Sequence, residues 1–245
     1  MRWLRGVWRI ARAKLHVLHG AFIVATRFGR IDAAERARLV QWWSTEFLRR
    51  LGVDLIAQGT PRPGAKLLVA NHISWLDIMA INAVVPARFV SKSEVRHWPV
   101  FGWLANKTDT LFIERERPRD ALRVVHQMAA ALQAGDTLAV FPEGTTANGH
   151  ALLPFHANLL QAAVATATPV QAIALRFADA EHAISPAAAY VGDTSLLQSL
   201  WWVACADGLT ARVTVLPAQS VAHADRRRLA ERLRSEIDEA LALAD

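Results

Sequence analysis

The sequence places a histidine and an aspartate five residues apart, His72 and Asp77, directly after a short apolar run at residues 66–70. The length of this run and its branched residues predict a buried strand. In parallel sheets, ligands bind beyond the carboxyl ends of the strands, and a histidine oriented by a carboxylate can act as a general base toward a hydroxyl. On this pair alone, the alternative is a histidine at a helix start that takes no part in chemistry.

Two further groups of polar residues also follow predicted strands. In the sequence F-P-E-G-T-T, which begins at residue 141, the proline and Gly144 predict a sharp turn that presents Glu143 and backbone amides. Such amides can hold an oxyanion or a phosphate, and the carboxylate can bind hydroxyls or a basic group. Arg115 follows the apolar run at residues 110–113, where a guanidinium group suits a phosphate or a carboxylate. For each group alone, a solvated charge beside a turn is the alternative.

These three junctions belong to an alternation of short apolar runs and helical patterns that follows the Gly- and Pro-containing residues 59–64. The predicted strands lie at residues 66–70, 88–90, 110–113, 137–141, 170–176, 188–191 and 211–216. The predicted helices lie at residues 74–84, 119–134, 155–166, 196–206 and 225–244. This order predicts an α/β fold with a mostly parallel sheet flanked by helices, and we assign residues 59–245 to this domain.

The basic charge of the chain is concentrated at its N-terminus. Residues 1–50 contain eleven Lys or Arg and three acidic residues, whereas the other 195 residues contain 17 and 19. Arginines at spacings of three and four residues form one stripe of a predicted helix, with Trp and Leu on its other side. Such a helix suits a bilayer interface. The residues expected to bind an anionic membrane surface are Trp3, Arg5, Trp8, Arg9 and Arg12.

A second predicted helix at residues 32–51, which Asp32 can cap, completes an amphipathic helical hairpin. We assign residues 1–58 to this membrane-associating hairpin. The apolar run at residues 15–26 is shorter than a membrane span and contains two histidines. Three alternatives stay open: a nucleic-acid-binding arm, two ordinary helices packed on the domain, and a cleaved signal peptide. Our expectation is a membrane surface and no nucleic acid.

The overall composition excludes several other classes of protein. With 53% hydrophobic and 20% charged residues, the chain is not of the disordered or collagen-like type. Cys205 is its only cysteine, so the chain has neither an internal disulfide nor a cysteine array for structural zinc. We therefore expect no metal and no bound cofactor.

The three junctions occur in one order, each at the end of a predicted strand. The first block, N-H-x-S-x-x-D, is formed by Asn71, His72, Ser74 and Asp77. The second is F-I-E-R at residues 112–115, and the third is F-P-E-G-T at residues 141–145. Over roughly residues 51–177 the sequence thus resembles the lysophospholipid acyltransferases of the glycerol-3-phosphate/1-acylglycerol-3-phosphate acyltransferase superfamily. Each block alone is a weak signal, and the three together are a specific one.

The resemblance implies transfer of a fatty acyl group from acyl-CoA or acyl carrier protein to the free hydroxyl of 1-acyl-sn-glycerol-3-phosphate, giving phosphatidic acid. His72 would deprotonate the hydroxyl, and Asp77 would hold the imidazole and balance its charge. With either donor, the thioester arrives from the cytoplasm, which places the protein at the cytoplasmic face of the inner membrane. The residues expected to contact the lysolipid acceptor are Asn71, Ser74, Arg115, Glu143, Gly144, Thr145 and Thr146.

The sequence departs from the pattern at one position that bears on the acceptor. Thr146 stands where many members that form phosphatidic acid have an arginine, so a charged group that would grip a phosphate is missing. An alternative acceptor is therefore lyso-ornithine lipid or another lysolipid. A different class of alternative is a membrane-surface protein without catalysis, although it would have no need of both His72 and Asp77.

Overall fold

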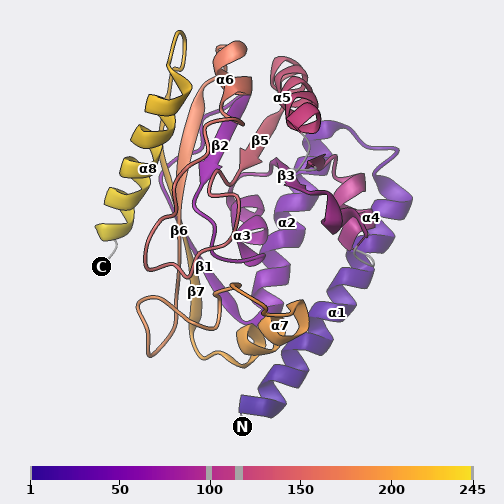
Figure 1. The fold of residues 1–245 in the computed structure, drawn as a ribbon. Coiled ribbons are helices and arrows are strands. Elements are labelled where there is room, and N and C mark those ends of the chain that lie inside the picture. Colours follow the sequence, from indigo (N-terminus) through magenta and orange to yellow (C-terminus); the bar gives the residue numbers. More distant parts are fainter. Residues whose placement is uncertain (1, 98–100, 114–117, 244–245) are drawn as a thin grey trace.

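A computed structural model describes residues 2–97, 101–113 and 118–243 of the chain (Figure 1). The described residues form a seven-stranded sheet of order β1-β7-β6-β2-β5-β3-β4. Its strands are β1 (Val53–Gln58), β2 (Lys66–Ala70), β3 (Arg88–Lys92), β4 (Leu111–Ile113), β5 (Thr137–Val140), β6 (Val170–Ala178) and β7 (Leu209–Gln219). All neighbouring strands pair in parallel except β6 and β7, so the predicted α/β class with a mostly parallel sheet is confirmed.

Helices cover both faces of this sheet. They are α1 (Arg2–Arg27), α2 (Ala33–Leu51), α3 (Leu76–Val84), α4 (Phe101–Lys107), α5 (Pro118–Gln133), α6 (Gln161–Ala165), α7 (Leu196–Cys205) and α8 (Arg226–Ala242), with a 3-10 helix η1 at Ser93–His97. Residues of α2, α3 and α7 share one core cluster with the sheet, and residues of α5, α6 and α8 share the other. In Figure 1, α1 (indigo) and α8 (yellow) lie on opposite sides of the strands.

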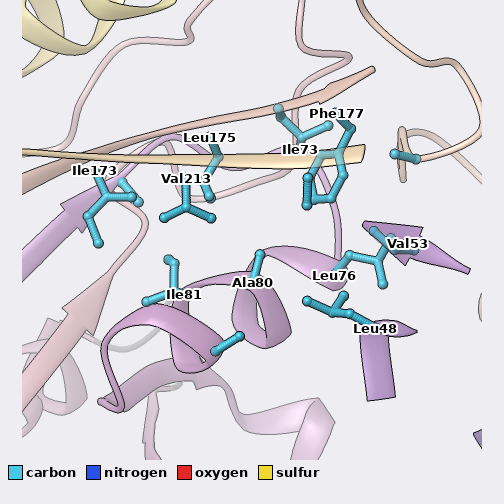
Figure 2. Packing of buried hydrophobic residues seen from close by; sticks show 14 of the residues in the cluster. Leu48, Val53, Ile73, Leu76, Ala80, Ile81, Ile173, Leu175, Phe177 and Val213 are labelled. Carbon is cyan, nitrogen blue, oxygen red and sulfur yellow. The ribbon is translucent and has the colours of Figure 1, made fainter. Parts of the chain in front are cut away.

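The two cores use alternate residues of the same strands, as the period of two in an extended chain requires. In β2, Leu68 and Ala70 face the α3 side, whereas Leu67 and Val69 face the α5 side. Figure 2 shows the first core, in which α3 residues lie beneath residues of β6 and β7, among them Leu76, Ala80, Ile81, Ile173, Leu175 and Val213. Because β2 is buried on both faces, the turn that follows it is held on a rigid base.

The predicted hairpin is present, and its second helix begins and ends at recognisable signals. The Asp32 side chain accepts a hydrogen bond from the amide of Glu35 at 2.7 Å and so caps α2. Gly52 ends this helix in the left-handed conformation, with a φ of 79°. The helix α2 packs on α3 and α1, so the hairpin is integrated with the rest of the chain.

Several predicted elements need correction. Residues 188–191 form no strand, and the helix predicted at residues 155–166 is only Gln161–Ala165. The sequence did not predict β1, which pairs with β7 along the edge of the sheet. Residues 53–58, which the sequence analysis assigns to the hairpin, therefore belong to the sheet. The apolar run of β1 is short, since Asp54 and Gln58 interrupt it, and most of its residues are open to solvent at the edge of the sheet.

The turn after β1 depends on Gly59, which has a φ of +81°. A Cβ atom at this position would lie 1.9 Å from the carbonyl oxygen of Val215 in β7. Gly64 has a similar φ of +76°, but a Cβ atom there would have no heavy atom within 4 Å. Gly64→Ala therefore has the same backbone strain without the clash and serves as the control. Gly59→Ala is expected to lower the free energy of unfolding by about 2 kcal/mol more than Gly64→Ala in urea titrations. Equal losses in the two variants would show that the close approach to β7 is not needed.

Candidate active site

His72 lies in the turn between β2 and α3, and its imidazole is bonded to a buried carboxylate. The distance from His72 Nδ1 to Asp77 Oδ2 is 2.7 Å, and Asp77 is completely buried. Since a carboxylate only accepts hydrogen bonds, this contact assigns the proton of the neutral ring to Nδ1. Nε2 is then the basic nitrogen, and it has no hydrogen-bond partner among the described residues. The predicted pairing of these two side chains is confirmed.

The same Asp77 oxygen also shapes the backbone of the turn. It accepts hydrogen bonds from the amides of Ile73 at 2.7 Å and Ser74 at 2.9 Å. The turn itself is not helical, because α3 begins only at Leu76. Asp77 therefore holds the ring and the approach to α3 with one atom, and the turn cannot shift without disturbing the imidazole.

The His72 ring is fixed from its face as well as from its edge. It stacks on Phe141 with ring centroids 4.0 Å apart and an angle of 9° between the rings. Phe141 in turn stacks on Phe89 with a centroid distance of 5.9 Å. Packing of this kind restricts the rotamer, which leaves Nε2 aimed in one direction while the side chain stays 19% exposed.

Glu143 is buried and serves the His72 turn rather than an open site. Its two carboxylate oxygens accept hydrogen bonds from the amide of His72 at 2.7 Å and from the amide of Leu153 at 2.9 Å. The side chain is 4% exposed, and burial raises the pKa of Glu143 against the opposing effect of these two hydrogen bonds. The expectation that Glu143 contacts the head group therefore needs correction, since the carboxylate is buried and binds backbone amides.

Asn71 and Ser74 are also buried, and their expected contact with the acceptor needs the same correction. The Asn71 amide donates to the carbonyl of Leu175 at 2.9 Å and accepts from the amide of Leu175 at 2.7 Å. It thereby links the end of β2 to β6. Ser74 is completely buried, and its hydroxyl has no partner among the described residues. Both residues shape the turn and offer no polar atom to a ligand outside it.

The turn after β5 differs in detail from the prediction. Gly144 has a φ of 76°, as the predicted sharp turn requires, but its amide donates to the carbonyl of Phe141 at 3.1 Å. Thr145 is exposed, whereas the half-buried Thr146 donates its hydroxyl to the carbonyl of Tyr190. Arg115 lies outside the described residues. Of the residues expected to contact the acceptor, Thr145 is thus the one whose side chain is described and open to solvent.

An apolar cavity of about 200 Å³ lies next to the aromatic stack, between the helical hairpin and the first core. Phe89 and Trp75 line it from the side of the sheet and α3, and Trp43 and Phe28 line it from the hairpin. Phe89 also stacks on Phe141, which stacks on the His72 ring, so two aromatic rings lie between the cavity and the imidazole. No local sequence pattern predicts this cavity, because its walls come from segments far apart in the chain.

Along α1, large apolar side chains point to solvent, and the two central arginines point to the protein. The exposed side chains are Trp3, Leu4, Val7, Trp8, Leu15, Leu18 and Phe22, each between 44% and 67% exposed. Arg5 forms an ion pair with Asp207 at 2.8 Å, and Arg9 donates to the carbonyls of Ala204 at 3.1 Å and Ala206 at 2.8 Å. The expected contact of Arg5 and Arg9 with lipid phosphates needs correction, because the C-terminal end of α7 uses both groups.

Two kinds of feature are absent from the described residues. No group of three or more His, Cys, Asp or Glu side chains in this part of the chain could hold a metal ion. No helix in the same part combines the length and the apolar character that a membrane crossing requires.

Comparison with known proteins matches this arrangement to one family. A family model described as Acyltransferase matches residues 56–176. The 1-acyl-sn-glycerol-3-phosphate acyltransferase of Neisseria meningitidis serogroup B is 35% identical over 188 residues, 76% of this chain and 73% of that protein. The chain belongs to the glycerol-3-phosphate/1-acylglycerol-3-phosphate acyltransferase superfamily. The family assigned from the three sequence blocks is confirmed.

Two other relatives extend this comparison. The lyso-ornithine lipid O-acyltransferase of Pseudomonas aeruginosa is 38% identical over 165 residues, which is 67% of this chain and just under two thirds, 63%, of that protein. The crystal structure of the 1-acyl-sn-glycerophosphate acyltransferase of Thermotoga maritima has a TM-score of 0.74 and 20% identity, and it covers 99% of this chain and 97% of that chain. The latter likeness supports the fold, including the pair of N-terminal helices.

The role of Glu143 can be separated from head-group binding by Glu143→Gln. The amide cannot accept from both His72 and Leu153, so one amide proton faces an NH2 group. We expect the free energy of unfolding to fall by about 2 kcal/mol. We expect kcat to fall at least about tenfold through the displaced ring, with little change in the acceptor KM. The exposed Glu181→Gln is the matched control. An increase in the acceptor KM alone would instead place Glu143 against the acceptor.

Proposed function

We propose that this protein is an O-acyltransferase that moves a fatty acyl group from a thioester to the hydroxyl of a lysolipid. The observation that carries the proposal is the His72 imidazole, bonded through Nδ1 to buried Asp77 at 2.7 Å with Nε2 left unpaired. Nε2 takes the proton of the acceptor hydroxyl, and Asp77 stabilises the imidazolium that forms. The nascent alkoxide attacks the thioester carbonyl, and the departing thiolate takes the proton back from Nε2.

No acyl-enzyme is required by this mechanism. Cys205, at the end of α7, packs close to Gly6 of α1, and among the described residues no hydrogen bond joins its thiol to a base. A buried or half-buried thiol of this kind has a packing role.

The apolar cavity beside Phe89 suits the hydrocarbon chain of the substrate. Its lining is almost entirely apolar, and it reaches the stack of rings that carries His72. Burial of methylene groups there would hold the carbonyl carbon near Nε2 and contribute binding free energy away from the reacting atoms. Acyl-CoA and acyl carrier protein both fit the mechanism as donors, since both present a thioester, and the proposal needs no bound cofactor.

We propose 1-acyl-sn-glycerol-3-phosphate as the acceptor and phosphatidic acid as the product. One observation favours lyso-ornithine lipid as a second candidate. Thr146 brings no charge to the turn after β5, and its hydroxyl is bonded to Tyr190, so this position offers no cation to a phosphate. The names of the Neisseria and Pseudomonas relatives cover both acceptors.

Association with an anionic membrane surface at the cytoplasmic side is part of the same proposal. A lysolipid partitions into a leaflet, and the exposed apolar face of α1 can enter the interface beside the cavity that the hairpin lines. Arg12 and Lys14, which are not among the residues that bind α7, supply positive charge on this helix. The thioester would then arrive from the aqueous side.

Product analysis tests the proposed reaction. Purified protein in mixed micelles would receive an acyl thioester with either 1-acyl-sn-glycerol-3-phosphate or lyso-ornithine lipid, and products would be identified by mass spectrometry. We expect phosphatidic acid from the wild type and a loss of more than about 100-fold in His72→Ala. Ornithine lipid formed instead would keep the mechanism and change the acceptor. No product with either lipid, although vesicles still bind, would favour the non-catalytic alternative.

Membrane association has its own test in the apolar face of α1. Trp8→Glu and Leu15→Glu replace side chains that are 64% and 67% exposed, so folding should be little affected. Each substitution should lower the affinity for vesicles with anionic lipids about tenfold in flotation experiments, because a buried apolar side chain is lost. Leu122→Glu, at a 58% exposed position of α5, is the matched control. Equal vesicle binding by all three variants would contradict the role of α1.

A further inference from the structure

The 17 residues between β6 and α7, residues 179–195, form neither helix nor strand and yet are held at defined points. We refer to them as the β6–α7 segment. Ser185 and Ala188 of this segment are buried, with 1% and 0% exposure. The amide of Ser185 donates to the carbonyl of Phe177 at 2.8 Å, so the segment folds back on the end of β6. It is therefore an ordered wall of the molecule.

The beginning of this segment is fixed by Asp179. Its carboxylate accepts hydrogen bonds from the Ser185 hydroxyl, from the amides of Glu181 and His182 at 2.9 Å, and from the His182 ring at 2.8 Å. Burial alone would raise the pKa of Asp179, but these bonds outweigh it and lower the pKa to about 2. The carboxylate thus stays ionised, and the turn that it organises is intact, throughout the neutral range.

The middle of the segment is fixed directly to the active-site turns. The amide of Tyr190 donates to the carbonyl of Ile73 at 3.0 Å, and its carbonyl accepts from the hydroxyl of Thr146. The amide of Ala147 donates to the carbonyl of His72 at 2.7 Å. The backbone of one residue of the segment, Tyr190, therefore joins the turn that carries His72 to the turn after β5.

A close packing contact adds to these hydrogen bonds. A Cβ atom on Gly149, which has a φ of +87°, would lie 3.0 Å from Ile184 and 3.6 Å from Ile73. The segment thus lies against both active-site turns at two places. The apolar cavity, in contrast, reaches His72 through Phe89 and Phe141. The apolar cavity and the β6–α7 segment therefore lie next to different neighbours of the imidazole.

We infer that Thr146 is a positioning residue for the acceptor, and that it acts by tethering the Tyr190 peptide, and with it the β6–α7 segment, beside His72. The inference rests on the proposed function and deepens it. The tether needs a hydroxyl donor at position 146 and a backbone carbonyl at position 190, so it depends on the side chain of the first and not on that of the second. Position 146 thereby sets the wall against which the acceptor lies.

Steady-state kinetics of four full-length variants tests this inference. Thr146→Val removes the donor, and Thr146→Ser and Tyr190→Phe keep the tether. Thr166→Val removes a half-buried hydroxyl that donates to the carbonyl of Ala162 at the C-terminal end of α6. We expect Thr146→Val to raise the KM for the acceptor about tenfold, with the KM for the thioester unchanged. The other three should match the wild type with 1-acyl-sn-glycerol-3-phosphate or lyso-ornithine lipid, whichever the wild type acylates.

Amide hydrogen exchange gives a readout that does not depend on turnover. The Tyr190 amide should exchange faster in Thr146→Val and at the wild-type rate in Thr146→Ser. An unchanged acceptor KM in Thr146→Val, or an equal rise in the KM values of acceptor and thioester, would overturn the inference. The proposed function would still stand in that case, because the wild type turns over. Absence of turnover by the wild type with either lipid would overturn the proposed function, and the inference with it.

Discussion

A single carboxylate oxygen, Oδ2 of Asp77, accepts three hydrogen bonds, and the geometry of the site depends on it. One comes from the His72 ring and two come from the amides of Ile73 and Ser74. The ring and the turn therefore share an anchor. Because this oxygen is completely buried, its hydrogen bonds are stronger than they would be in water, and leaving any donor unpaired would be costly. The orientation of the His72 imidazole thus follows from the same interaction that shapes the chain between β2 and α3.

The neighbouring buried polar groups hold this turn from its other sides. Asn71 fixes its first residue to β6, and Glu143 binds the amide of His72 from the turn after β5. Burying an amide and a carboxylate is unfavourable unless their hydrogen bonds are satisfied, and here backbone groups satisfy them. Thr146 and Tyr190 continue the same network into the β6–α7 segment. Several motif residues that the sequence suggests as ligands of the substrate, Asn71, Glu143 and Thr146, therefore hold the turn that carries the His72 imidazole.

The sequence was sufficient for the fold class and for the pairing of His72 with Asp77, since both depend on short-range patterns. Alternating apolar runs and helical periods predict the sheet, and the spacing of His72 and Asp77 fits a turn at the end of a strand. The predictions that were wrong concern side chains whose direction depends on contacts between distant segments. The direction of the Glu143 carboxylate is set by Leu153, and that of Arg9 by the end of α7. Local periodicity predicts neither of these side-chain directions. It distinguishes one face of a helix from the other, but it does not show which segment packs on that face.

The dependence on distant contacts also explains why a strand was wrongly predicted at residues 188–191 and why the apolar cavity was not predicted. Residues 188–191 are apolar but form no strand, because the Tyr190 amide donates to the carbonyl of Ile73 in the turn after β2 and not to a neighbouring strand. The cavity exists only where the hairpin meets α3 and the sheet, so no single stretch of sequence could show it. Both the conformation of residues 188–191 and the cavity therefore depend on packing between segments far apart in the chain.

The single-turnover rate constant of acyl transfer in Asp77→Asn tests the central claim most directly. An asparagine oxygen can still accept from the turn and from the ring, so the fold should survive, but the negative charge that stabilises the imidazolium is lost. The account predicts a rate constant lower by at least about 100-fold, with vesicle binding and thermal stability close to those of the wild type. A rate constant within a few-fold of the wild type would contradict the assignment of His72 and Asp77 as the proton-transfer pair.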